Sequence, residues 1–199
     1  RAGGGGRGIR KVERAQDAGK AFTEAHAEAE AAFGDGECYM EKFVAPAHHV
    51  EVQVLADAHG NVVTLGEREC SVRERMYEAA RNLARAVGYE GAGTIEYLYA
   101  DDGNFYFMEM NTRLQVEHPV TEFVTDIDLV KWQLRVAAGV EFPYAQDEIM
   151  PAKRSHAIEC RINAEGPAPD YRPSCGTIHS MHVPNGPWVR FDSSLYPGA

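Results

Sequence analysis

The stretch TIEYLYADDGNFYFMEM, residues 94–110, decides the fold. Two runs rich in β-branched and aromatic residues, 94–99 and 105–110, flank the turn sequence Asp-Asp-Gly-Asn at 101–104. Strand-like runs around an Asp-Gly pair are the strongest short-range signal for a β-hairpin. The sequence therefore predicts an antiparallel hairpin at these residues.

The length of the hairpin loop predicts which side chains face each other. A two-residue loop at Asp102-Gly103, or a four-residue loop over 101–104, places Glu96 directly opposite Glu109. A three-residue loop would shift the pairing by one residue. Carboxylates on directly opposed residues repel each other, which favours a bridging Mg²⁺ or Mn²⁺ ion bound jointly with phosphate. In the alternative interpretation, one of the two glutamates faces solvent.

Polar residues alternate with other residues beyond the hairpin. The polar positions are Glu109, Asn111, Arg113, Gln115 and Glu117. A strand that continued through residue 117 would place all five side chains in one row. Such a row favours a site for charged ligands, and the alternative is a half-solvated edge strand.

The rest of the chain reads as a mixture of helices and strands. Amphipathic periodicity and stop signals predict helices over residues 15–33, 73–87 and 128–138. Strands are expected at residues 9–12, 39–44, 49–56 and 62–65, with further short strands and turns after residue 156. Because the strands pair mostly through hairpins, the predicted class is α+β with a mainly antiparallel sheet.

Two other features have both a functional and a structural interpretation. The glycine-rich residues 3–8 could wrap phosphate oxygens with backbone N–H groups, or they form a flexible linker. On the strand predicted at 49–56, His49, Glu51 and Gln53 share one face, and valines occupy the other. That polar face is either solvated or part of a site.

Composition limits the partners and the compartment. The net charge of −10 and the pI of about 5.3 argue against nucleic acid or an anionic membrane as the main partner, because both require a basic surface. No apolar run approaches the length needed to span a membrane. The four cysteines are scattered, which is typical of a reduced, cytoplasmic protein.

Seven segments of the chain resemble the biotin carboxylases, the ATP-grasp components of biotin-dependent carboxylases. They are the glycine loop ending at Arg7-Gly8, MEKF at 40–43, HVEVQVL at 49–55, GERECSV at 66–72, GAGTIE at 91–96, EMNTRLQVEHPVTE at 109–122 and ECRINAE at 159–165. The resemblance runs essentially from end to end. It implies an α+β ATP-grasp fold, with mainly antiparallel sheets and flanking helices.

The resemblance also implies a domain organisation. A partial lid subdomain with the glycine loop is expected at residues 1–43, followed by the ATP-grasp and C-terminal domain at 44–199, truncated at its end. Three parts of the family pattern are missing: a phosphate-binding lysine before the glycine loop, a segment after Val72 that contacts nucleotide and bicarbonate, and the N-terminal domain. The chain is therefore expected to be an internal piece that is inactive alone.

The activity implied by the resemblance is ATP-dependent carboxylation of biotin by bicarbonate through carboxyphosphate, the first half-reaction of an acyl-CoA carboxylase. The cofactors are ATP and Mg²⁺ or Mn²⁺, with biotin as the carrier-bound substrate. The implied partners are a biotin carboxyl carrier protein and a carboxyltransferase, separate or fused, and the resemblance allows a homodimer.

Site residues follow from the resemblance position by position. The metal is assigned to Glu96, Glu109 and Asn111, and bicarbonate to Arg113, Gln115 and Val116. Glu117 is the base, Arg113 assists in catalysis, and Arg161 stabilises the biotin enolate. His118 is expected to order the turn before Pro119. The nucleotide is assigned to Gly4, Gly5, Gly6, Glu41, Lys42, Val44, His49 and Glu51.

The sequence also allows other functions. Carbamoyl-phosphate synthases share the carboxylate pair and the glycine lid, but they typically lack the Arg-x-Gln-x-Glu-His sequence found at residues 113–118. Thr112 and the His118-Pro119 pair favour an acyl-CoA carboxylase over a pyruvate carboxylase. A non-catalytic nucleotide-binding module would bind ATP without turnover, and a purely structural acidic domain would bind nothing.

Overall fold

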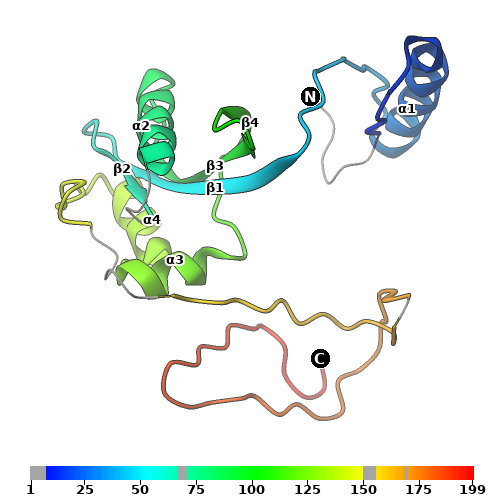
Figure 1. Ribbon diagram of the computed structural model, residues 1–199. Helices are drawn as coiled ribbons and strands as arrows, with labels where there is room; N and C mark the ends of the chain where they lie inside the picture. Colours follow the sequence, from blue (N-terminus) through cyan, green and yellow to red (C-terminus); the bar gives the residue numbers. More distant parts are fainter. Residues whose placement is uncertain (1–7, 67–70, 150–155, 169) are drawn as a thin grey trace. The chain divides into compact units, whose positions relative to one another are not determined.

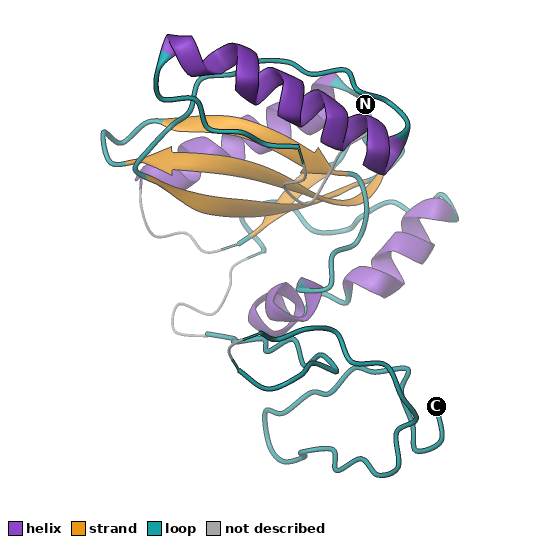
Figure 2. Cartoon of the chain, turned by 90° about the vertical axis from the view of Figure 1, so that its right-hand side faces the viewer, coloured by secondary structure: helices purple, strands orange, loops and turns teal. Residues whose placement is uncertain are grey.

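The computed structural model describes residues 8–66, 71–149, 156–168 and 170–199. The chain forms two compact units, Arg1–Ala157 and Ile158–Ala199. All the named helices and strands belong to the first unit. The described part of the second unit consists of loops and turns with one isolated bridge, between Glu165 and Pro173 (Figure 2). No helix in the described residues is both long and apolar enough to cross a membrane.

The first unit is built on one antiparallel sheet of four strands in the order β2-β1-β3-β4 (Figure 1). Its members are β1 (Ala47–Ala56), β2 (Val62–Leu65), β3 (Gly91–Ala100) and β4 (Phe105–Asn111). The predicted α+β class with mainly antiparallel sheet is therefore confirmed, as are the strands predicted at 49–56 and 62–65 and the hairpin at 94–110.

The helical elements are the 3₁₀ turn η1 (Ala15–Asp17) and the helices α1 (Ala18–Phe33), α2 (Ser71–Ala86), α3 (His118–Thr125) and α4 (Leu129–Ala137). Helices α2 and α4 pack against this sheet. Helix α1 ends at Gly34, whose φ of 70° is left-handed and suits glycine. Helix α4 begins at Asp128, whose side chain accepts a hydrogen bond from the Lys131 backbone. All three predicted helices are confirmed.

The two faces of the sheet differ in character. Helix α2 covers one face, where the apolar cluster is made of Val52, Val54, Ile95, Tyr97, Met76 and Ala80. On the opposite face, Leu55 and Ala92 pack with Leu129 and Trp132 from α4, and Figure 1 shows α2 and α4 on opposite sides of the sheet. Because side chains alternate along a strand, the residues of β1 before Leu55 that share its face are Gln53, Glu51 and His49. The α4 face is thus apolar at one end and polar at the other.

The β3–β4 hairpin reaches the predicted pairing through a bulge. Near the turn, Tyr99 pairs with Phe105 and Tyr97 with Phe107, which is the register of a three-residue loop. A register shift follows, with Met108 as the extra residue, and Glu96 then pairs with Glu109. The loop length favoured from sequence was therefore wrong, and the predicted pair is nevertheless confirmed.

A buried aspartate fixes the β1–β2 turn against the loop after α4. Asp57 is 3% exposed and accepts hydrogen bonds from the backbone N–H groups of His59, Asn61 and Phe142 and from the Asn61 side chain, at 2.8–3.0 Å. Burial alone would raise the pKa of the Asp57 carboxyl group, but these donors outweigh burial and lower the pKa below its usual value of 3.8.

Several predicted strands are absent from the described residues. Residues 9–12 and 39–44 form no strand, and the part described after residue 156 has only the isolated bridge. Tyr39 and Met40 are 84% and 86% exposed. A β-prone sequence becomes a strand only where a partner edge and a packing surface are available, and the described residues offer neither to these segments.

Candidate metal and nucleotide site

Three glutamates lie side by side across the polar end of the sheet. Glu51 on β1 pairs directly with Glu96 on β3, and Glu96 pairs directly with Glu109 on β4. Directly opposed like charges destabilise a sheet unless something compensates for them. The row therefore has the charge arrangement expected of a cation site.

Glu96 is the most firmly held member of the row. It is 7% exposed, and His49 Nε2 donates to its Oε2 at 2.7 Å. Its Oε1 accepts from Asn111 Nδ2 and from Gln115 Nε2 at 3.4 Å. A buried carboxylate requires such donors, and here they fix both oxygens in place.

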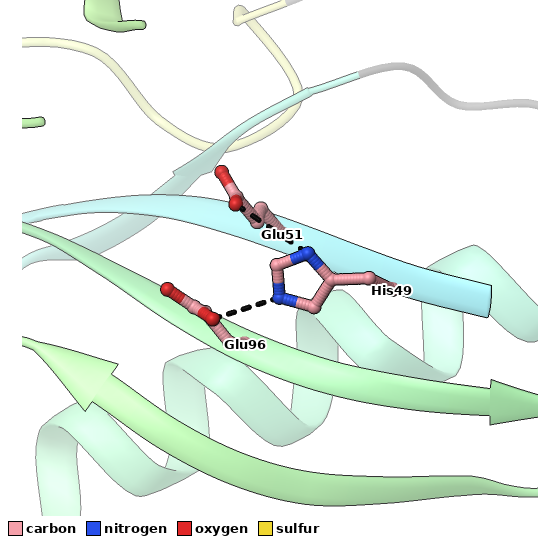
Figure 3. Close-up of side chains that lie close together, drawn as sticks. All are labelled: His49, Glu51 and Glu96. Atoms are coloured by element: carbon pink, nitrogen blue, oxygen red, sulfur yellow. Dashed lines mark hydrogen bonds and ion pairs between the residues drawn. The ribbon is translucent and has the colours of Figure 1, made fainter. Parts of the chain in front are cut away.

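His49 lies between two carboxylates from neighbouring strands (Figure 3). Its Nδ1 is 3.7 Å from Glu51 Oε1, while its Nε2 contacts Glu96. Burial raises the pKa of the Glu51 carboxyl group, and the nearby charges of Glu117 and Glu96 raise this pKa further, against an opposing effect of His49. The site is thus a region of concentrated negative charge.

The polar residues after Asn111 reach the site by a different path from the one predicted. The prediction of one strand through residue 117 is wrong: β4 ends at Asn111, and Glu117 is the N-cap residue of α3. Pro119 near the start of α3 is the sequence signal for this helix. The intervening loop turns back, so that Gln115 is buried beside Glu96.

Arg113 and His118 organise this loop. Arg113 is exposed, and its Nη2 donates to Asn111 Oδ1 at 3.2 Å. His118 Nδ1 donates to the Gln115 backbone oxygen at 2.8 Å, which confirms the expectation that His118 orders the turn before Pro119. Of the residues expected to share a row, Glu109, Asn111 and Gln115 therefore lie against Glu96. Arg113 contacts Asn111, and the charge of Glu117 acts on Glu51.

The remaining predicted residues are distributed over other parts of the chain. Gly4, Gly5 and Gly6 lie outside the described residues. Glu41, Lys42 and Val44 lie in the extended connector before β1. Lys42 and Val44 line a hollow of about 330 Å³, together with Tyr106 and the β3–β4 turn. Val116 is 58% exposed. Arg161 is an exposed residue of the second unit, Ile158–Ala199.

The convergence of His49, Glu51 and Glu96 was not predicted. His49 and Glu96 are 47 positions apart, and only the β1–β3 register brings them together. The sequence signal was present on each strand separately, as a polar residue at alternate positions. The local sequence of a strand does not indicate which other strand will pair with it.

Two family models match the chain. The model of the carbamoyl-phosphate synthase L chain ATP-binding domain matches residues 1–76 and 71–145, and the model of the biotin carboxylase C-terminal domain matches residues 159–199. The biotin carboxylase of Nostoc sp. is 48% identical over 215 residues, covering 98% of this chain and 48% of that protein. The alignment is longer than the chain's 199 residues, so this relative has residues within the matched span that have no counterpart here.

Solved structures give the same result. A biotin carboxylase complex with β-γ-ATP from Campylobacter jejuni matches with a TM-score of 0.91 and 43% identity, over 100% of this chain and 48% of that one. The biotin carboxylase domain dimer of Hydrogenobacter thermophilus 2-oxoglutarate carboxylase, in complex with MgADP, ADP and bicarbonate, matches with a TM-score of 0.84 and 41% identity, over 93% and 45% of the two chains.

The predicted ATP-grasp architecture is thereby confirmed, and the chain spans about half the length of the curated relatives it matches. Both parts of the biotin carboxylase pattern, the ATP-binding domain and the beginning of the C-terminal domain, are present in the expected order. The chain belongs to the biotin carboxylase family of ATP-grasp proteins.

Proposed function

We propose that the protein containing this chain carboxylates biotin, using ATP and bicarbonate. The observation that carries this proposal is the buried, doubly anchored Glu96 in a row with Glu51 and Glu109. Around this row lie the residues that the family resemblance assigns to metal, anion and base. The proposed reaction is that of the relatives. The geometry supports it because the site could hold a metal ion, ATP phosphates and bicarbonate.

Glu96 and Glu109 would hold Mg²⁺ or Mn²⁺, with Asn111 beside them. Their oxygens are the hard ligands these ions prefer, and their direct pairing across β3 and β4 suits a shared cation. When bound, the ion neutralises charge on the ATP phosphates during phosphoryl transfer. Lys42 and Val44, which line the hollow at the connector, are proposed with Glu41 as nucleotide contacts, and so are His49, Glu51 and the glycines 4–6.

Arg113, Gln115 and the backbone of Val116 would bind bicarbonate. A planar guanidinium suits a planar anion with two accessible oxygens. Asn111 orients Arg113, and Gln115 is oriented by its contact with Glu96. A carboxamide nitrogen carries two hydrogens, so donating to Glu96 leaves Gln115 the capacity to contact an anion.

Glu117 would remove the proton of bicarbonate, so that an oxygen of the bicarbonate can attack the γ-phosphorus of ATP. As the N-cap residue of α3, Glu117 directly follows the anion-binding loop. Its charge acts on Glu51, which supports a position close to the glutamate row.

Arg161 would stabilise the enolate that forms on the ureido oxygen when biotin N1 loses its proton. A biotin carboxyl carrier protein and a carboxyltransferase, separate or fused, would deliver biotin and use the carboxylated product. A homodimer is supported by the dimer named for the Hydrogenobacter relative.

The final acceptor is proposed to be an acyl-CoA, because Thr112 and the His118-Pro119 pair resemble the acyl-CoA carboxylases. A 2-oxoacid acceptor is the second candidate, and the match to a 2-oxoglutarate carboxylase domain favours it. The choice would be made by the carboxyltransferase, outside this chain.

The test is ATP hydrolysis by the full-length protein, measured with and without bicarbonate and free biotin. We expect ADP release to depend on bicarbonate and carboxybiotin to appear when biotin is added. ATP binding without bicarbonate-dependent turnover would support a nucleotide-binding module instead. Absence of ATP binding would support a structural domain.

A further inference from the structure

We infer that His49, Glu51 and Glu96 form a site for a borderline transition-metal dication, Zn²⁺ above all, that fills without nucleotide. One ligand atom from each residue lies within 4.8 Å of the others. This set differs from the oxygen-only set of Glu96, Glu109 and Asn111 proposed above, because it contains an imidazole nitrogen and omits Glu109. It therefore goes beyond the proposed ATP chemistry.

The donor atoms of the three residues lie near one another. In a tetrahedral site, ligand bonds of 2.0–2.2 Å place neighbouring donor atoms roughly 3.3–3.6 Å apart. His49 Nε2 is 2.7 Å from Glu96 Oε2, whereas the contact with Glu51 Oε1, at 3.7 Å, is made by Nδ1 on the other side of the ring (Figure 3). Only one ring nitrogen can bind a given ion. With one atom taken from each residue, the three donors lie within 4.8 Å of one another, so side-chain rotations would have to draw them together around a common ion. A fourth position would remain for water or an anion, as in three-ligand zinc sites.

The backbone holds these ligands in place before any ion binds. Glu51 and Glu96 are directly paired within the ten-residue β1–β3 register, and His49 shares the face of Glu51. The second oxygen of Glu96 accepts from Asn111 and Gln115. Hydrogen bonds of this kind orient carboxylate ligands in metal sites.

In the part of the chain that the structure describes, one imidazole is the only ion-pair partner of Glu51 and Glu96. Among the residues that the structure describes, neither Glu51 nor Glu96 forms an ion pair with a lysine or arginine; His49 is the partner of both. Glu117 adds further negative charge near Glu51. A dication would offset this repulsion more fully than one imidazole does.

A buried hydroxyl on the same face also lacks a partner. Thr94 is 2% exposed, and its Oγ1 has no hydrogen-bond partner among the described residues. Thr94 precedes Glu96 by two residues on β3, so both side chains face the same side of the sheet. Water on a bound metal would give this hydroxyl the partner that a buried polar group requires.

The nitrogen ligand decides the kind of metal. Mg²⁺ prefers oxygen ligands, whereas imidazole suits Zn²⁺ and its neighbours in the transition series. Zn²⁺ at this position would occupy Glu96, which the ATP-bound metal also needs. Zn²⁺ is therefore expected to compete with Mg²⁺ for the site.

The test is calorimetric titration of Zn²⁺ into metal-free full-length protein, without nucleotide, on the wild type and four variants. His49→Gln keeps a hydrogen-bonding group but removes the imidazole, and Glu51→Gln removes one carboxylate. Each should weaken Zn²⁺ binding about tenfold or more, since loss of even an outer-shell partner costs 10–100-fold. His48→Gln is the matched control, because His48 lies on the opposite face of β1 with a side chain 76% exposed.

Equal Zn²⁺ affinity in wild type and His49→Gln would overturn the inference, as would an equal loss in His48→Gln. Zinc X-ray absorption should show the outer-shell scattering of one imidazole ring in the wild type and none in His49→Gln. If His49→Gln failed to fold, judged by thermal unfolding, Glu51→Gln would decide alone. Glu109→Gln separates this site from the ATP site: Zn²⁺ binding should persist there while Mg²⁺-ATP binding weakens.

Discussion

Glu96 lies directly opposite Glu109 only because a bulge at Met108 corrects the register that the hairpin turn sets. The turn alone would offset the two carboxylates by one position. Bulges commonly re-aim side chains beside functional sites, and here the bulge completes the row of three glutamates. Its effect is to bring a third carboxylate beside Glu96.

Loss of the Glu109 carboxylate should weaken the binding of Mg²⁺. In the full-length protein, Glu109→Gln is expected to raise the Mg²⁺ concentration for half-maximal ATP turnover about tenfold or more, because an exposed carboxylate proposed as a metal ligand is lost. The measurement is bicarbonate-dependent ADP release across a Mg²⁺ series. A wild-type Mg²⁺ dependence would remove Glu109 from the metal site.

Glu117 should be needed to remove the bicarbonate proton but not to bind ATP. Glu117→Gln keeps the shape of the side chain and removes the base. Bicarbonate-dependent hydrolysis is therefore expected to fall about 10²–10⁴-fold, with ATP affinity close to wild type. Turnover rates and ATP titrations on the same preparation check this. A loss of only a few-fold would mean that another group accepts the proton.

Much of the fold was predictable because its sequence signals are local. The Asp-Asp-Gly-Asn turn with its flanking β-branched and aromatic runs marks the hairpin, and apolar periodicity with Gly34 and Asp128 at helix ends marks α1 and α4. The resemblance added residue roles that no periodicity could supply. These roles remain predictions, because each of them describes the binding or reaction of a ligand.

What could not be predicted depends on contacts distant in sequence. Residues 112–117 alternate as a strand would, but Pro119 and the buried contact of Gln115 with Glu96 form a loop and a helix instead. Tyr39 and Met40 have strand propensity without a partner strand. The contact between His49 and Glu96 depends on the β1–β3 register, which is defined only when the sheet has formed.

Asp57 should stabilise the fold in a pH-dependent way. The pKa of the Asp57 carboxyl group is lowered in the folded protein from its usual value of 3.8, so the stabilisation is fully present above that usual value and is lost as pH falls through the folded-state pKa. Asp57→Asn should cost about 1–3 kcal/mol at pH 7, because the amide keeps one acceptor oxygen but replaces the other with an NH₂ group, which cannot accept from the donors that face it.

The measurement is urea unfolding of the full-length protein at pH 7 and again at the lowest pH at which it remains folded. The gap between wild type and Asp57→Asn should narrow in acid. Asp101→Asn is the control, because the Asp101 side chain is 65% exposed and its loss should change stability little. A pH-independent gap would assign the effect to packing and not to charge.

Arg161 should separate biotin chemistry from ATP chemistry. Negative charge grows on the ureido oxygen only as N1 loses its proton, so a guanidinium there favours the transition state. Arg161→Gln is expected to lose about 10²–10³-fold in biotin carboxylation, while bicarbonate-dependent ATP cleavage survives far better. Equal losses in parallel assays would show that Arg161 supports the fold or the phosphate site.

The 199-residue chain by itself should show no bicarbonate-dependent ATPase activity, because the predicted phosphate-binding lysine and the segment expected after Val72 are absent. The assay is ADP release by the isolated chain beside the full-length protein at equal molar concentration. Robust activity in the isolated chain would show that these parts are dispensable.

The most direct test is the transfer of isotope-labelled bicarbonate to free biotin by the full-length protein. Wild type should form labelled carboxybiotin only when ATP and Mg²⁺ are present. Glu96→Gln should lose roughly 100-fold or more, since Glu96 is both the buried centre of the glutamate row and a proposed metal ligand. Labelling that needed no ATP, or that Glu96→Gln left at the wild-type rate, would contradict the assignment of biotin carboxylation to this site.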